Sequence, residues 1–134
     1  MKLDITATMD AIAPLQGFAA DFCAADPALS GQENVLALIL EELVTNTVTH
    51  GGAVPDSIIS VNLLCRGGAI ELVYEDSGCP FNPCEQLPED DRDKSVEMRR
   101  TGGLGWHLIQ EMCASVDYEH RDGRNRLTMI RETG

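Results

Sequence analysis

The chain has 134 residues, the length of one domain, and 43% of them are hydrophobic, which excludes a disordered chain. Its formal charge of −12, from 10 basic and 22 acidic side chains, disfavours direct binding to nucleic acid or to an anionic membrane, because phosphates would be repelled. No apolar stretch is long enough to span a bilayer, the first residues contain no apolar signal region, and the five cysteines lack framework spacing, so we expect a cytoplasmic protein with reduced thiols.

The first half of the chain predicts a strand followed by two helices. Apolar and polar residues alternate over residues 3–8, which is the period of a strand. The next apolar residues recur at helical spacing: Ile12, Leu15, Ala19 and Phe22. Ser30 and Glu33 have the spacing of a capping box. They open a longer helix, predicted over about residues 31–50, which a Gly-Gly pair ends.

The second half predicts two hairpins and one more helix. Residues 59–65 and 70–75 alternate in polarity and are joined by a Gly-Gly turn. A short helix is expected over 104–112, and a last hairpin pairs 116–120 with 126–131 around an Asp-Gly turn. Strands that pair as hairpins, with helices on one face, predict an α+β fold: a two-layer sandwich with a mostly antiparallel, mixed sheet.

The segment from Cys79 to Thr101 has no periodicity, and it contains three prolines and a charged run from Glu89 to Lys94. Loops of this length are usually functional lids or disordered. Cys79 and Cys84 are two thiols without nearby partners, which disfavours a metal site. For the charged run, a solvated loop is favoured over a cation site.

One face of the long helix carries residues that suit a nucleotide site. Glu42, Asn46 and His50 recur every four residues and therefore share that face. A carboxylate one turn from a carboxamide can hold Mg²⁺ through oxygen ligands, or can activate a hydroxyl. The alternative is that the glutamates simply face solvent, although an asparagine inside an apolar helix is unfavourable without a reason.

Two glycine-containing stretches add to this pattern. Asp76 ends a predicted strand and can accept a hydrogen bond from an exocyclic amine, while Gly78 lets a ligand approach the backbone. Residues 102–105, Gly-Gly-Leu-Gly, precede a helix whose free amides suit phosphate. The alternatives are an ordinary turn at Asp76 and glycines that only form the loop before the helix.

The order and spacing of these stretches resemble the GHKL ATPase superfamily, which has the Bergerat ATP-binding fold. Within it, the chain resembles the stand-alone bacterial anti-sigma-factor serine/threonine kinases. Residues 42–51 are similar to the N box, 76–83 to the G1 box, 103–105 to the G2 box and 117–128 to the closing hairpin. The resemblance covers nearly the whole chain. It implies a single histidine-kinase-like ATPase domain, residues 1–134, with an ATP lid at about residues 79–103.

By position, the resemblance implies a role for each matching residue. Glu42 would be the general base for a substrate hydroxyl, Asn46 would ligate Mg²⁺ on the ATP phosphates, and Asp76 would accept from the adenine amino group. The other implied nucleotide contacts are Gly78 and Thr128 beside the base, Gly103, Leu104 and Gly105 at the phosphates, His50 facing the phosphates, and Arg99 and Arg100 at the γ-phosphate.

The resemblance further implies a kinase that transfers the γ-phosphate of ATP to a serine or threonine of a STAS-domain anti-sigma-factor antagonist. Such a kinase would also bind a sigma factor or similar regulator, and would form a homodimer. Two alternatives stay open: a non-catalytic ATP-sensing interaction module, and a detached histidine-kinase catalytic domain. Intact Glu42 and Asn46 weigh against the first, and the lack of a histidine in the first predicted helix weighs against the second.

Overall fold

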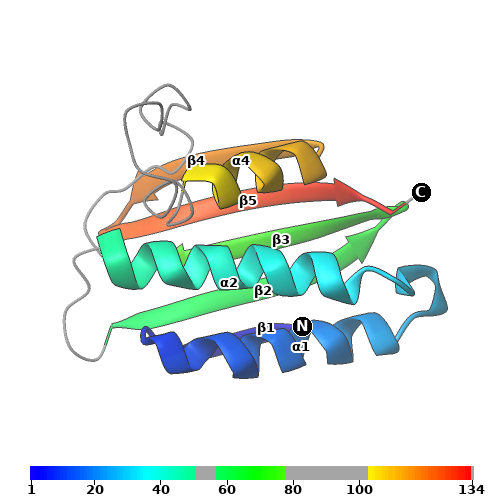
Figure 1. Cartoon of the computed structure of the whole chain (residues 1–134), viewed down its shortest axis with the longest axis horizontal. Coiled ribbons are helices and arrows are strands. Elements are labelled where there is room, and N and C mark those ends of the chain that lie inside the picture. The colour runs from blue at the N-terminus through cyan, green and yellow to red at the C-terminus, as the bar shows by residue number, and fades with distance from the viewer. Residues whose placement is uncertain (51–56, 78–102, 134) are drawn as a thin grey trace.

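The computed structural model describes residues 1–50, 57–77 and 103–133, which form a helical layer on a five-stranded sheet (Figure 1). The strand order is β1-β2-β3-β5-β4. The strands are β1 (Lys2–Thr6), β2 (Ile58–Arg66), β3 (Ala69–Asp76), β4 (Ser115–Arg121) and β5 (Arg124–Glu132). The predicted α+β sandwich is confirmed. All four pairings between these strands are antiparallel, so the described sheet lacks the parallel pair that a mixed sheet would have.

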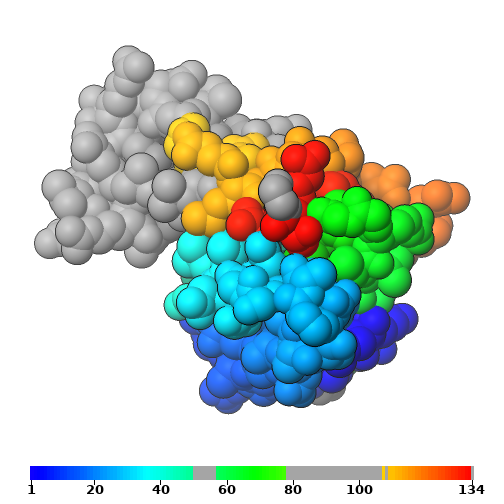
Figure 2. All heavy atoms as spheres, turned by 90° about the vertical axis from the view of Figure 1, so that its right-hand side faces the viewer, coloured from blue at the N-terminus to red at the C-terminus, as the bar shows by residue number. Residues whose placement is uncertain are grey.

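Within the described residues, three α-helices cover one face of the sheet (Figure 1). They are α1 (Ile12–Ala24), α2 (Glu33–His50) and α4 (Gly103–Met112), with short 3-10 helices at Met9–Ala11 and Pro27–Leu29. Figure 2 views the molecule from the end where α2 begins and shows the atoms of α1 and α2 packed closely against those of the strands. No described helix combines the length and the apolarity needed to cross a membrane.

The core lies between the two layers. The predicted apolar stripe of α2 is buried, and so are alternate residues of β2 and β3. These residues are Leu36, Ile39, Leu40 and Leu43 on α2, Ile59, Val61 and Leu63 on β2, and Ile70, Leu72 and Tyr74 on β3. Full burial of each large apolar side chain contributes about 1.5–3 kcal/mol. Cys65 alternates in step with Ile59, Val61 and Leu63 but is exposed, because it lies near the end of the strand, beyond Leu63.

The start of α2 differs from the predicted capping box. The Glu33 carboxylate does reach back and accepts from the Gly31 amide at 3.1 Å. Ser30, however, ends the short helix of residues 27–29, and α2 begins at Glu33, two residues later than expected. The physical reason is Gly31, whose φ of +88° turns the chain between the two helices and is a conformation that glycine adopts readily.

The last hairpin turns at the expected Asp-Gly pair. Asp122 and Gly123 both have positive φ, 55° and 77°, as a two-residue hairpin turn of type I′ requires. Such a tight turn sets the register of β4 on β5. On its other side β5 pairs with β3, so that Asn125 lies directly opposite Asp76. This register places the polar side chains that are described below.

Two glycine substitutions test the backbone assignment. We expect Gly123→Ala to lower the free energy of unfolding by about 1–2 kcal/mol, because alanine is strained at positive φ. Gly17→Ala is the matched control: Gly17 is inside α1, and an added methyl group would meet no atom within 4 Å. It should raise the free energy of unfolding by about 0.5–1 kcal/mol. Urea denaturation measures both, and shifts of the same sign would contradict the assignment.

Candidate functional site

The candidate site forms where the C-terminal half of α2, the end of β3 and the start of β5 meet (Figure 1). Glu42 and Asn46 lie on successive turns of α2, and Asp76 is the last residue of β3. The helix α4 packs beside α2 and begins at this same end of the sheet, at Gly103 (Figure 1). The fold therefore gathers three of the stretches that the sequence singled out.

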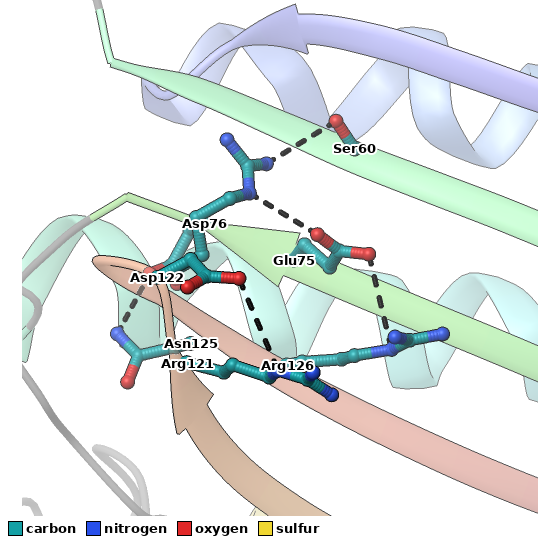
Figure 3. A network of polar contacts seen from close by, with 8 residues as sticks. Ser60, Glu75, Asp76, Arg121, Asp122, Asn125 and Arg126 are labelled. Carbon is teal, nitrogen blue, oxygen red and sulfur yellow. Dashed lines mark hydrogen bonds and ion pairs between the residues drawn. The ribbon is translucent and has the colours of Figure 1, made fainter.

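Asp76 is 7% exposed, and both of its carboxylate oxygens accept hydrogen bonds. Oδ2 accepts from the Thr47 hydroxyl at 2.9 Å. Oδ1 accepts from the Asn125 side-chain nitrogen at 2.8 Å, a bond that Figure 3 shows. Burial of a carboxylate is strongly unfavourable unless such donors replace water. A carboxylate offers about four acceptor positions, so these two bonds are compatible with a further donor such as an exocyclic amine.

The Thr47 hydroxyl lies within hydrogen-bond distance of three oxygen atoms. These are Asp76 Oδ2 at 2.9 Å, the Tyr74 hydroxyl at 2.7 Å and the Leu43 carbonyl oxygen at 3.0 Å. A hydroxyl has one proton, and a carboxylate is the strongest acceptor among the three, so Thr47 donates to Asp76. The Tyr74 hydroxyl can donate to Thr47 or to the Leu43 carbonyl oxygen at 3.2 Å, and the shorter distance favours Thr47.

Tyr74 is suited to be the donor at the start of this chain of bonds. Its pKa is raised above the ordinary value, chiefly by burial; the bond from Thr47 lowers it, and the charge of Asp76 raises it further. The phenol therefore keeps its proton throughout the physiological range. The two bonds Tyr74 to Thr47 and Thr47 to Asp76 then point in one direction, toward the carboxylate.

Glu42 and Asn46 are different, because each has a buried polar atom that lacks a hydrogen-bond partner among the residues that the structure describes. The atoms are Glu42 Oε1 and Asn46 Nδ2, and Asn46 is only 4% exposed. Most buried polar atoms in folded proteins are satisfied, and each exception calls for an explanation. A carboxylate and a carboxamide on one helix face, with unused hydrogen-bonding capacity, suit a ligand that presents both a metal ion and phosphate oxygens.

The half-buried position of Glu42 also changes its acidity. Burial raises the pKa of the Glu42 carboxyl above its ordinary value, and the neighbouring charge of Glu41 raises it further. A carboxylate with a raised pKa binds a proton more strongly. It is therefore a better general base near neutral pH than an exposed glutamate.

The structure brings Glu42, Asn46 and Asp76 to the same end of the sheet. The Gly103-Leu104-Gly105 stretch opens α4, so the predicted glycine-rich sequence does lie at a helix start. The other predicted contacts lie outside the described residues: Gly78, Arg99, Arg100, the side chain of His50 and the lid up to residue 102.

Thr128 was predicted to lie beside the base, and the register shows that it does not. It pairs with Val73 on β3, three residues from Asp76. Successive side chains of a strand point to opposite faces, so Thr128 projects from the open face of the sheet and Asp76 from the helix-covered face. Because Thr128 is an odd number of residues from Asn125, which lies opposite Asp76, its side chain points away from the site.

Asn125, and not Thr128, is the β5 residue whose side chain contacts Asp76. It is 6% exposed, lies opposite Asp76, and its amide bonds the Asp76 carboxylate. The Asp-Gly turn was visible in the sequence and would have located the start of β5. Only the pairing of β5 with β3 identifies Asn125, however, and the local sequence pattern does not reveal that pairing.

Comparison with known proteins agrees with this geometry. The profile described as Histidine kinase-like ATPase domain matches residues 5–131. The chain is also similar to Serine/threonine-protein kinase BtrW of Bordetella bronchiseptica, with 27% identity over 96 residues, 70% of this chain and 66% of the relative. The match thus spans just under two thirds of that relative's length. Since the family profile covers nearly the entire chain, the protein belongs to the histidine kinase-like (GHKL) ATPase family.

Proposed function

We propose that this protein is an ATP-dependent serine/threonine kinase of the anti-sigma-factor type. It transfers the γ-phosphate of ATP to a serine or threonine of a STAS-domain antagonist and regulates a sigma factor, or a similar regulator, by binding it. One observation favours a kinase over an ATP-sensing module. The α2 face carries a carboxylate with a raised pKa and a carboxamide whose nitrogen has no partner among the described residues, and binding of the base alone needs neither group.

The residues present fit ATP together with Mg²⁺. When bound, the metal ion supplies positive charge to the phosphate oxygens during transfer. Asn46 would hold it through the amide oxygen, because rotation of the amide by 180° presents either its oxygen or its nitrogen. A chain with a net charge of −12 otherwise repels a triphosphate. The first amides of α4 are a second source of partial positive charge.

The remaining groups divide the work of phosphoryl transfer between positioning and proton removal. Asp76 orients the nucleotide by accepting from the adenine amino group. Glu42 accepts the proton of the substrate hydroxyl, and its raised pKa suits that task. Catalysis of this kind is mostly positioning and charge stabilisation, so a site with one base, one metal-binding amide and a helix start is sufficient.

The identity of the protein substrate is inferred from resemblance. The relative named Serine/threonine-protein kinase BtrW supports a hydroxyl acceptor. The stand-alone anti-sigma-factor kinases, which the motif order resembles, act on STAS-domain antagonists, and the same resemblance supports a homodimer.

Nucleotide binding is the first test. Titration calorimetry should show binding of ATP and ADP with Mg²⁺, and EDTA should weaken it. Asp76→Ala should lower the affinity by at least about tenfold, because a hydrogen bond to a charged group contributes about 1.5–3 kcal/mol. GTP should bind far more weakly, since guanine presents a carbonyl where Asp76 requires a donor. Equal affinity for GTP would contradict the adenine assignment.

A pair of α2 variants separates binding from chemistry. Glu42→Gln should keep nucleotide affinity but lower phosphoryl transfer by about 10²–10⁴-fold, the usual effect of losing a general base. Asn46→Ala should lose both, because the metal ligand is removed. Transfer of labelled phosphate from ATP to a STAS-domain protein measures the rate, with Glu41→Gln as the matched control. Undiminished transfer by Glu42→Gln would refute the role of Glu42 as general base. If the wild type binds nucleotide but transfers no phosphate, the ATP-sensing module is favoured instead.

The raised pKa of Glu42 also makes a prediction about folding stability without ligand. A raised pKa in the folded state means that the folded protein binds this proton more tightly than the unfolded chain does. The stabilising contribution of this tighter proton binding to the free energy of unfolding is fully present below the ordinary pKa of 4.5. It is lost as the pH rises through the raised pKa. Glu42→Gln should therefore raise Tm at pH 7 but not at pH 4. Thermal denaturation at both pH values tests this, with a smaller rise expected for the exposed Glu41→Gln. An equal shift at both pH values would contradict it.

A further inference from the structure

We propose that Tyr118 is a positioning residue for base recognition and that it acts through Asn125 on Asp76. The inference rests on the proposed function, in which Asp76 accepts from the 6-amino group of adenine. It adds an element that the sequence motifs did not include, the edge strand β4. Tyr118 need not contact the nucleotide to have this effect.

The contacts run across three neighbouring strands. The Tyr118 hydroxyl on β4 donates to Asn125 Oδ1 on β5, and Asn125 Nδ2 donates to Asp76 Oδ1 on β3 at 2.8 Å (Figure 3 shows the second bond). The register pairs Tyr118 with Leu127, two residues from Asn125, so the two polar side chains are diagonal neighbours on the helix-covered face. The strand register thus places the Tyr118 hydroxyl next to the Asn125 amide.

The direction of the Asn125 amide explains why Tyr118 matters. A side-chain amide has one donor end and one acceptor end. The carboxylate of Asp76 takes the donor end, so the buried acceptor end requires a donor of its own, which the Tyr118 hydroxyl supplies. Without this hydroxyl the amide loses the contact that holds its acceptor end, and the Asp76 carboxylate is held less firmly on the β5 side.

The carboxylate is held on its other side by Thr47 of α2. Two donors that approach from different elements restrict rotation of the Asp76 carboxylate, and thereby set the directions from which it can accept hydrogen bonds. Those directions affect only a ligand that donates a hydrogen bond to Asp76. The effect of Tyr118 should consequently depend on the 6-amino group of the bound base, whereas a general packing role would not.

The experiment compares two nucleotides in the full chain with Mg²⁺: ADP, and purine riboside 5′-diphosphate, which lacks the 6-amino group. Tyr118→Phe keeps the ring that packs against the core and removes only the hydroxyl. It should weaken ADP about three- to tenfold, the worth of one hydrogen bond. Its affinity for the purine nucleotide should stay within about twofold of wild type. In the double variant with Asn125→Ala, Tyr118→Phe should have no additional effect on ADP, because the hydroxyl acts through that amide.

Glu119→Gln is the matched control, since Glu119 is next to Tyr118 but exposed on the opposite face of β4, and it should change neither affinity. Equal weakening of both nucleotides by Tyr118→Phe would assign a structural role and overturn the proposal. An unchanged affinity for ADP would overturn it as well. If the wild type binds the two nucleotides equally, the adenine role of Asp76 fails, and the positioning role of Tyr118 fails with it. If the wild type prefers ADP and Tyr118→Phe keeps the same preference, only the positioning role fails.

Discussion

The buried carboxylate of Asp76 constrains both the fold and the site. At 7% exposure it requires hydrogen bonds in place of water, and Thr47 and Asn125 provide them. One donor belongs to the helical layer and the other belongs to the neighbouring strand. The same two bonds therefore tie α2 to the sheet and fix the orientation of the group that is proposed to recognise the base. A change in either donor alters packing and recognition together.

The two acidic groups of the site are in opposite environments. Asp76 is buried with donors on both oxygens, whereas half-buried Glu42 has a buried oxygen that lacks a partner among the described residues, as does the side-chain nitrogen of Asn46. The hydrogen bonds to Asp76 fix the acceptor without a large loss in the free energy of unfolding. The arrangement at Glu42 leaves an unfavourable charge on α2, which a metal ion with phosphate would relieve. Unsatisfied polar atoms on an otherwise well-packed helix are consistent with a site built for a ligand and not for stability alone.

Sequence periodicity and spacing predicted the elements, and they placed Glu42 and Asn46 on one face of a helix and Asp76 at a strand end, where the structure has them. They failed where the outcome depends on pairing between strands. Thr128 matched the family hairpin, yet the register of β5 on β3 turns it to the other face and puts Asn125 opposite Asp76. A shift of one residue in register exchanges the two faces of a strand, and a local pattern does not determine that register.

The direction of the hydrogen bonds limits what the site can bind. Two chains of bonds converge on Asp76, one from Tyr74 through Thr47 and one from Tyr118 through Asn125. Burial raises the pKa of Tyr74, so the first chain begins at a hydroxyl that retains its proton. Every bond in both chains then donates toward the carboxylate, and Asp76 is held as an acceptor. In the proposed function, a base that presents a donor at this position would be bound, and one that presents a carbonyl would be rejected, because two acceptors would face each other in a buried place. Selectivity for adenine would then depend on proton positions two side chains away from the ligand.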